Sequence, residues 1–241
     1  MDSTRPLAED CLIAAKDASL AGRVVWPADP PGGAVVLGLL GTDSRFTSRN
    51  NFLATSLARA GLAVLVVELL TEDEDARLDL AHPDLPLLAE RLCLAADWIA
   101  ARGGLAIDGV GLLGVGEVGA AALVAAAARP ELARAVVCAA TPLELAGSSA
   151  LLTASPTLVL VGDGDQRSLL GSRLVSSMRC EHRVEVICGA GPRLVEPGAL
   201  DRVVNLAAPW LLSRLRPASP REAGRSTSPP TAAASSPLRT P

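Results

Sequence analysis

The sequence predicts an α/β protein with a mostly parallel sheet and helices on both of its faces. Continuous apolar runs such as Ala34–Leu39 and Leu62–Val67 are typical of strands that are buried on both faces. Segments with helical spacing of apolar residues alternate with these runs, as expected of βαβ units. The chain has 241 residues, 49% of them hydrophobic, so one sizeable core is expected.

The first elements follow in order along the chain. Residues 1–20 have a mixed composition that predicts a weakly helical segment. Arg23–Trp26 is predicted as a short strand, because a cluster of Pro and Gly residues ends it. After the buried strand at Ala34–Leu39, Arg49–Ala60 has helical spacing and is followed by glycine, a typical C-terminal stop.

The next strand, Leu62–Val67, leads into an acidic segment over Glu68–Asp84, which is predicted to be a solvated loop. Its consecutive carboxylates lack the alternating ligand spacing of a calcium loop, so no metal site is predicted there. An amphipathic helix is predicted over Pro86–Arg102. The remaining elements are a strand at Val110–Leu113, a helix over Ala120–Arg129, strands at Arg134–Cys138 and Thr157–Val161, a helix over Leu169–Met178, a strand at Arg183–Ile187 and a helix over Gly198–Leu215.

Composition divides the chain into three parts. We expect an N-terminal segment over residues 1–21, one α/β domain over 22–215 and a tail over 216–241. The tail consists mainly of Pro, Ser, Ala, Thr and Arg, which cannot bury enough apolar surface to offset the ordering entropy, so it is predicted to be disordered. Within the domain, any site is expected at the carboxyl ends of the strands.

Charge and composition exclude several classes of function. The net charge of −4 and an aromatic content of 2% give neither the basic surface nor the stacking residues of a nucleic-acid-binding protein. No apolar stretch reaches the roughly 18 residues of a membrane span. The first residues lack a signal-peptide pattern, and the five cysteines are scattered, so we predict a cytoplasmic protein without a metal or other cofactor.

The stretch Gly109–Gly119 is the most informative one for function. A short strand is followed by a glycine-rich turn and then by an alanine-rich helix. This arrangement lifts one residue above the end of a sheet, and in many enzymes that residue is a nucleophile on a sharp elbow. Here the residue at the apex is Gly116.

A series of motifs runs in order through residues 22–215. They are Gly41–Ala60, Ala60–Ala63, Leu69–Thr71, Leu85–Leu92, Gly111–Pro130, Pro156–Asp165 and Glu196–Leu200. The series resembles the α/β-hydrolase superfamily, and within it the dienelactone-hydrolase-like branch, which includes domains fused to phosphoribosyltransferases. The resemblance implies the α/β-hydrolase fold in its small form without a lid, and carboxylic-ester or lactone hydrolysis.

The resemblance also implies a nucleophile, an acid and a histidine, in that chain order. The nucleophile motif Gly-x-Ser-x-Gly corresponds to Gly114–Val118, with Gly116 at the serine position and valine at the last glycine. Asp165 corresponds to the acid, and Pro192 stands at the histidine position. The oxyanion loop, where relatives carry a His-Gly pair, here reads Leu39–Leu40.

These replacements predict a pseudoenzyme. Glycine has no nucleophile and proline has no imidazole, so covalent acyl transfer lacks two of its groups and Asp165 is a relict acid. An active hydrolase would need substitutes such as Ser148, Ser149, His82 or His182. Ser148 and Ser149 are not expected on a strand-to-helix elbow, and His182 precedes its strand and is expected at the wrong edge of the sheet. His82 lies in the acidic loop and could approach the rim of the site. We therefore expect a role in binding a small molecule in the relict pocket or a protein partner, with residual ester or lactone hydrolysis as the alternative.

Glu117 has two possible roles beside the apex. A carboxylate at a helix start is favoured by the helix dipole, and the backbone N–H there corresponds to an oxyanion donor. Alternatively, Glu117 is a lone general base that activates water, with Asp163 and Asp165 near it. Such a carboxylate cluster could hold a divalent cation, but no ligand spacing demands one.

A different function class is suggested by Gly114–Gly119, which matches Gly-x-Gly-x-x-Gly after a strand and before a helix. Such a turn could bind the pyrophosphate of a dinucleotide at the helix start. The expected acid at the end of the next strand is missing, because no acidic residue occurs until Glu144. Dinucleotide binding is therefore the least favoured alternative.

Overall fold

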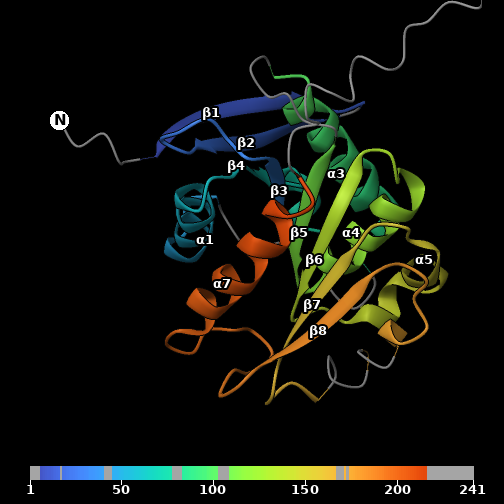
Figure 1. Ribbon diagram of the computed structural model, residues 1–241. Helices are drawn as coiled ribbons and strands as arrows, with labels where there is room; N and C mark the ends of the chain where they lie inside the picture. Colours follow the sequence, from blue (N-terminus) through green and yellow to red (C-terminus); the bar gives the residue numbers. More distant parts are fainter. Residues whose placement is uncertain are drawn as a thin grey trace, which may run out of the picture.

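The computed structural model describes residues 6–16, 18–40, 45–77, 83–102, 109–166, 171 and 174–215. These residues form one eight-stranded sheet with the order β1-β2-β4-β3-β5-β6-β7-β8 (Figure 1). Strand β2 is antiparallel to β1 and β4, and all other neighbours are parallel. The mostly parallel sheet predicted from the sequence is thus confirmed.

Every strand predicted from an apolar run is present, and β3 has the predicted bounds. The strands are β1 Leu7–Ala14, β2 Ser19–Trp26, β3 Ala34–Leu39, β4 Ala63–Glu68, β5 Val110–Val115, β6 Ala133–Ala139, β7 Thr157–Gly162 and β8 His182–Ile187. Strands β3 and β7 are buried along their whole length. This burial explains why their sequences are continuous apolar runs and do not alternate with polar residues.

Helices cover both faces of the sheet, as predicted. They are α1 Ser48–Arg59, α2 Glu72–Asp75, α3 Leu85–Ala100, α4 Glu117–Ala128, α5 Ser148–Leu152, α7 Ala199–Leu212 and the 3₁₀ helix η1 Leu143–Ala146. Helices α1 and α7 pack on one face, and α3 and α4 pack on the other, which gives two hydrophobic clusters (Figure 1). No helix in the described residues is long and apolar enough to cross a membrane.

Side-chain caps define where two of these helices begin. The hydroxyl oxygen of Thr47 accepts a hydrogen bond from the Asn50 N–H at the start of α1. The carboxylate of Asp84 accepts one from the Leu87 N–H at the start of α3. These bonds satisfy backbone donors that have no partner inside a helix.

The prediction of a weakly helical segment over residues 1–20 is wrong. Residues Leu7–Ala14 form β1, which pairs along its whole length with β2. Only Ile13 is buried in β1, so the strand lacks the alternation of apolar and polar residues that reveals a strand in sequence. The strand conformation of this segment depends on its pairing with β2, which the segment's own pattern does not reveal. The predicted boundary after residue 21 falls inside β2.

Two predictions lie outside the described residues. The helix predicted over Leu169–Met178 is described only in part, with helical residues at 171, 174 and 175. The tail predicted over 216–241 is not described at all.

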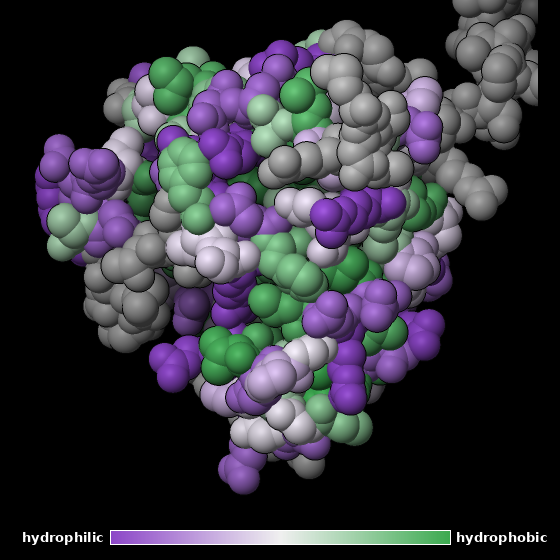
Figure 2. Space-filling model, turned by 90° about the vertical axis from the view of Figure 1, so that its left-hand side faces the viewer, coloured by the Kyte–Doolittle hydropathy of each residue, from purple (hydrophilic) through white to green (hydrophobic). Residues whose placement is uncertain are grey.

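On the face that Figure 2 shows, hydrophilic and hydrophobic side chains are interspersed.

Candidate functional site

The carboxyl ends of the parallel strands lie along one edge of the sheet, where α/β folds form their sites. The residues singled out in the sequence are Gly116 and Glu117 after β5, Asp165 after β7 and Pro192 after β8. The structure therefore brings all four to the same edge, on three strands. We refer to this edge as the carboxyl edge.

The turn between β5 and α4 is sharp, and Gly116 lies at its apex. Gly116 has a φ of 62° and a ψ of −134°, a conformation that is costly for a residue with a side chain. Its N–H donates to the Ala139 carbonyl oxygen on β6 (3.0 Å), and its own carbonyl oxygen accepts from the Gly119 N–H (3.0 Å). This is the strained strand-to-helix geometry of a nucleophile elbow.

The glycines of this turn are needed for different reasons. A Cβ at Gly114 would lie 2.4 Å from the Gly119 nitrogen, and a Cβ at Gly119 would lie 2.0 Å from the Thr141 Oγ1. Both positions therefore require glycine for close packing. At Gly116, by contrast, a Cβ would meet no atom within 4 Å. The packing around position 116 therefore leaves room for a side chain, although the residue there is glycine.

Glu117 is the first residue of α4 and is half-buried. Its side chain lies at the positive end of the helix dipole, a position where acidic residues are common. Its backbone N–H is one of the first four of the helix, which have no partner inside it. This placement fits each of the three roles considered from the sequence: a favourable position at the helix start, a backbone oxyanion donor and a general base.

Asp165 is only 5% exposed at the carboxyl end of β7. The loop that carries it contacts the loop after β8. The Gly164 N–H donates to the Ala190 carbonyl oxygen (3.1 Å), and the Asp163 Oδ1 accepts from the Gly189 N–H (2.9 Å). Asp163 therefore holds two loops together, and Asp165 is the buried carboxylate beside them.

Pro192 is exposed in the loop between β8 and α7. The backbone on both sides of it is held by polar contacts. The Gly191 N–H donates to the Glu196 carboxylate, and this bond is the main cause that lowers the pKa of Glu196. Arg49 on α1 donates from Nη1 to the Arg193 carbonyl oxygen (2.7 Å).

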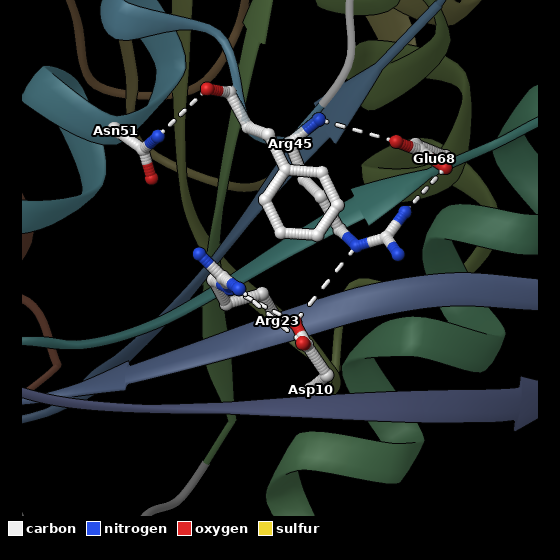
Figure 3. A network of polar contacts seen from close by, with 6 residues as sticks. Asp10, Arg23, Arg45, Asn51 and Glu68 are labelled. Carbon is white, nitrogen blue, oxygen red and sulfur yellow. Dashed lines mark hydrogen bonds and ion pairs between the residues drawn. The ribbon is translucent and has the colours of Figure 1, made fainter.

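The loop after β3 is tied to the sheet at Arg45, beyond residues 41–44, which are not described. Arg45 donates to the Glu68 carboxylate at the end of β4, from its backbone N–H (3.1 Å) and from Nη1 (2.8 Å) (Figure 3). The Phe46 ring stacks on the guanidinium groups of Arg23 and Arg45, each 4.4 Å from its centroid. Asp10 accepts two hydrogen bonds from Arg23. The network anchors the loop in which an oxyanion donor is expected.

The loop after β4 contains an ion pair that the sequence analysis missed. Arg91 on α3 is 4% exposed and donates to the Glu74 carboxylate through both Nη atoms (2.6 and 2.7 Å). Thr71 donates to the same carboxylate from its N–H (2.8 Å) and its hydroxyl (3.0 Å). The Arg91 bonds above all lower the pKa of Glu74 to about 2. The prediction that the acidic segment is a solvated loop is therefore wrong for Glu74.

Of the candidate substitutes for a catalytic serine or histidine, the three that the structure describes are not on the elbow. His82 lies outside the described residues. His182 begins β8 and so lies at the amino ends of the parallel strands, opposite the carboxyl edge, as expected from its place before the strand. Ser148 and Ser149 lie in α5, which follows η1 and not a strand.

The described residues contain no group of three or more His, Cys, Asp or Glu that could hold a metal ion. For a dinucleotide, the decisive position is the end of β6. Strand β6 ends at Ala139 and is followed by Ala140 and Thr141, so an acid for a ribose is absent there. Glu144 lies in η1.

The sheet, its helices and the elbow define a protein with the α/β-hydrolase fold. A crystal structure of dienelactone hydrolase from Anabaena variabilis matches 88% of this chain and 100% of its own, with a TM-score of 0.80 and 34% identity. The chain therefore belongs to the dienelactone hydrolase family. A metagenomic thermostable carboxylesterase (TM-score 0.71, 18% identity, 90% of this chain and 92% of its own) and a Pyrobaculum calidifontis esterase (0.67, 17%, 88% and 87%) share the fold.

Two curated relatives come from strains of Mycobacterium tuberculosis and are both named as phosphoribosyl transferases. Each is 34% identical over 208 residues, which cover 86% of this chain and 46% of the relative. The chain thus spans about half the length of the curated relatives it matches. A scan against models of known protein families finds no match.

Proposed function

We propose that this chain has lost the covalent chemistry of its family and acts by binding, either a small molecule at the carboxyl edge or a protein partner. The observation that carries the proposal is Gly116 at the apex of the elbow. Acyl transfer needs a nucleophile with a base in hydrogen-bond reach. Gly116 offers no attacking atom and Pro192 offers no imidazole.

An esterase assay tests the loss of catalysis. With p-nitrophenyl esters, we expect the protein to add nothing to the uncatalysed rate. Asp165→Ala removes the relict acid, and Asp29→Ala, at an exposed position in the loop before β3, is the matched control. Turnover that disappears in Asp165→Ala and persists in Asp29→Ala would overturn the proposal.

The alternative is slow hydrolysis by water, with Glu117 as a lone general base at the helix start. Backbone donors at the elbow would then stabilise the developing oxyanion. This alternative predicts that any residual turnover falls in Glu117→Gln and is unchanged in Asp29→Ala. Residual turnover that survives Glu117→Gln would exclude this role.

Binding of a dinucleotide at the turn over Gly114–Gly119 is the third candidate. Titration with NAD(P)H, followed by its fluorescence, should show saturable binding if this turn holds a pyrophosphate. No binding at millimolar ligand removes this candidate.

The curated relatives favour one class of protein partner. Since this chain covers about half of proteins named as phosphoribosyl transferases, we propose that it works beside such an enzyme. Co-purification with a phosphoribosyl transferase from the same genome tests this. If the two purified proteins do not bind each other when they are mixed, the proposal is contradicted.

All five cysteines are free thiols, which supports the proposed cytoplasmic location.

A further inference from the structure

Strand β8 forms one edge of the described sheet, beyond β7 (Figure 1). Its apolar residues Val184 and Val186 are 37% and 47% exposed. Its charged residues, Arg183 and Glu185, share the other face, where the Arg183 Nε donates to the Glu185 Oε1 (2.5 Å). An edge strand of this kind offers a row of backbone N–H and C=O groups to another strand.

The direction of these backbone groups can be read from the pairing with β7. N–H groups of β7 and of the residue after it donate to the carbonyl oxygens of Glu181 (2.9 Å) and Ile187 (3.3 Å). Backbone polar groups alternate between the two sides of a strand, so the odd-numbered residues direct theirs to β7. His182, Val184 and Val186 therefore direct their N–H and C=O groups away from the sheet.

We propose that β8 pairs antiparallel with β8 of a second copy of this chain, about a twofold axis at Val184. In this register Val184 lies opposite its own copy and His182 lies opposite Val186, so all the outward-directed groups can hydrogen-bond. Arg183 of each copy lies opposite Glu185 of the partner subunit. These two pairs are the non-hydrogen-bonded ones, whose side chains approach most closely.

Charge selects this register and this edge. A twofold axis at Arg183 would place two arginines opposite each other, and one at Glu185 would place two glutamates opposite each other, which is destabilising. The other edge strand, β1, contains Glu9 and Asp10 and no basic residue, so two copies would join like charges. Of the twofold axes at Arg183, Val184 and Glu185, the one at Val184 alone pairs opposite charges on one face of β8 and gathers the exposed valines on the other.

Charge reversal in the full chain tests the pairing, with mass measured by sedimentation over a concentration series. We expect a species of twice the chain mass of 24.6 kDa. Arg183→Glu or Glu185→Arg alone places like charges opposite each other, and each should weaken self-association roughly tenfold or more. Arg59→Glu on α1 makes the same change in net charge as Arg183→Glu at an exposed position and should not weaken it.

Mixing the two single variants gives the decisive result. In a mixed dimer Glu at position 183 faces Arg at position 185 of the partner subunit, so opposite charges meet again in both pairs. Dimers should therefore return on mixing, although each chain still lacks its own Arg183–Glu185 contact. A monomer at all concentrations, an effect of Arg59→Glu equal to that of Arg183→Glu, or no recovery on mixing would overturn the proposal.

Discussion

The β5–α4 turn and the β8–α7 loop lie on the same edge of the sheet but differ in what holds them. The turn is fixed by close packing of Gly114 against backbone and of Gly119 against the Thr141 side chain, and the space at its apex stays open although Gly116 has no side chain. The loop is fixed by polar contacts of its own, from Glu196 and Arg49. Elbow geometry is thus a property of the backbone packing, and it forms here with glycine at the apex.

The largest expected effect comes from two glycines of the elbow. Gly114→Ala forces a Cβ against backbone atoms at 2.4 to 2.6 Å, and we expect it to lower the free energy of unfolding by about 3 kcal/mol or more. Gly116→Ala meets only backbone strain, which costs about 1 kcal/mol. Urea unfolding measures both. Equal losses would show that packing does not fix the turn.

A gain-of-function experiment tests whether a histidine in the β8–α7 loop can reach a serine at the apex of the elbow. Gly116→Ser with Pro192→His adds the two missing groups beside Asp165, and we expect p-nitrophenyl acetate hydrolysis about a hundredfold above either single variant, because a base and a nucleophile act together. A steady-state assay of the three variants measures this. A double variant no faster than the singles would mean that the polar contacts hold position 192 away from the elbow.

The loop after β4 is a third case for comparison with these two, because the ion pair between Arg91 and Glu74 holds it in place. Glu74→Gln leaves Arg91 without its carboxylate and should cost ~2 kcal/mol near neutral pH, less than in a fully buried pair because the Glu74 side chain is 35% exposed.

The pH dependence of this contact has a definite sign. The pKa of Glu74 is lowered from 4.5 to about 2, so its contribution to stability is complete above pH 4.5 and is lost as the pH falls towards 2. Urea unfolding at several pH values should show this loss in the wild type and in Glu72→Gln, an exposed control in the same helix. The same loss in Glu74→Gln would contradict the assignment.

The smallest expected effect concerns the β8–α7 loop alone. The pKa of Glu196 is lowered chiefly by the Gly191 N–H, so this bond is complete above the ordinary value of 4.5 and breaks as the pH falls below it. Amide exchange of Gly191 should lose protection over that range. In Glu196→Gln the protection should no longer depend on pH there, while Gly119 in the elbow remains unaffected in both proteins.

The parts that sequence predicted are those that local patterns determine. Apolar runs predicted the strands β3 to β7, and the spacing of glycines placed Gly116 at the apex of the elbow. Strand β1 was missed because only one of its residues is buried, so its conformation depends on pairing with β2. The Arg91–Glu74 pair was missed because its partners are 17 residues apart and meet only after α3 packs on the sheet.

Covalent trapping tests the central claim most directly, because ester substrates also hydrolyse without an enzyme. The protein is treated with a fluorophosphonate, which labels activated serine nucleophiles, and the intact mass and the labelled peptide are measured. The proposed loss of covalent chemistry at Gly116 predicts no stoichiometric label. A one-to-one label on a single serine, abolished in Asp165→Ala and retained in Asp29→Ala, would contradict it.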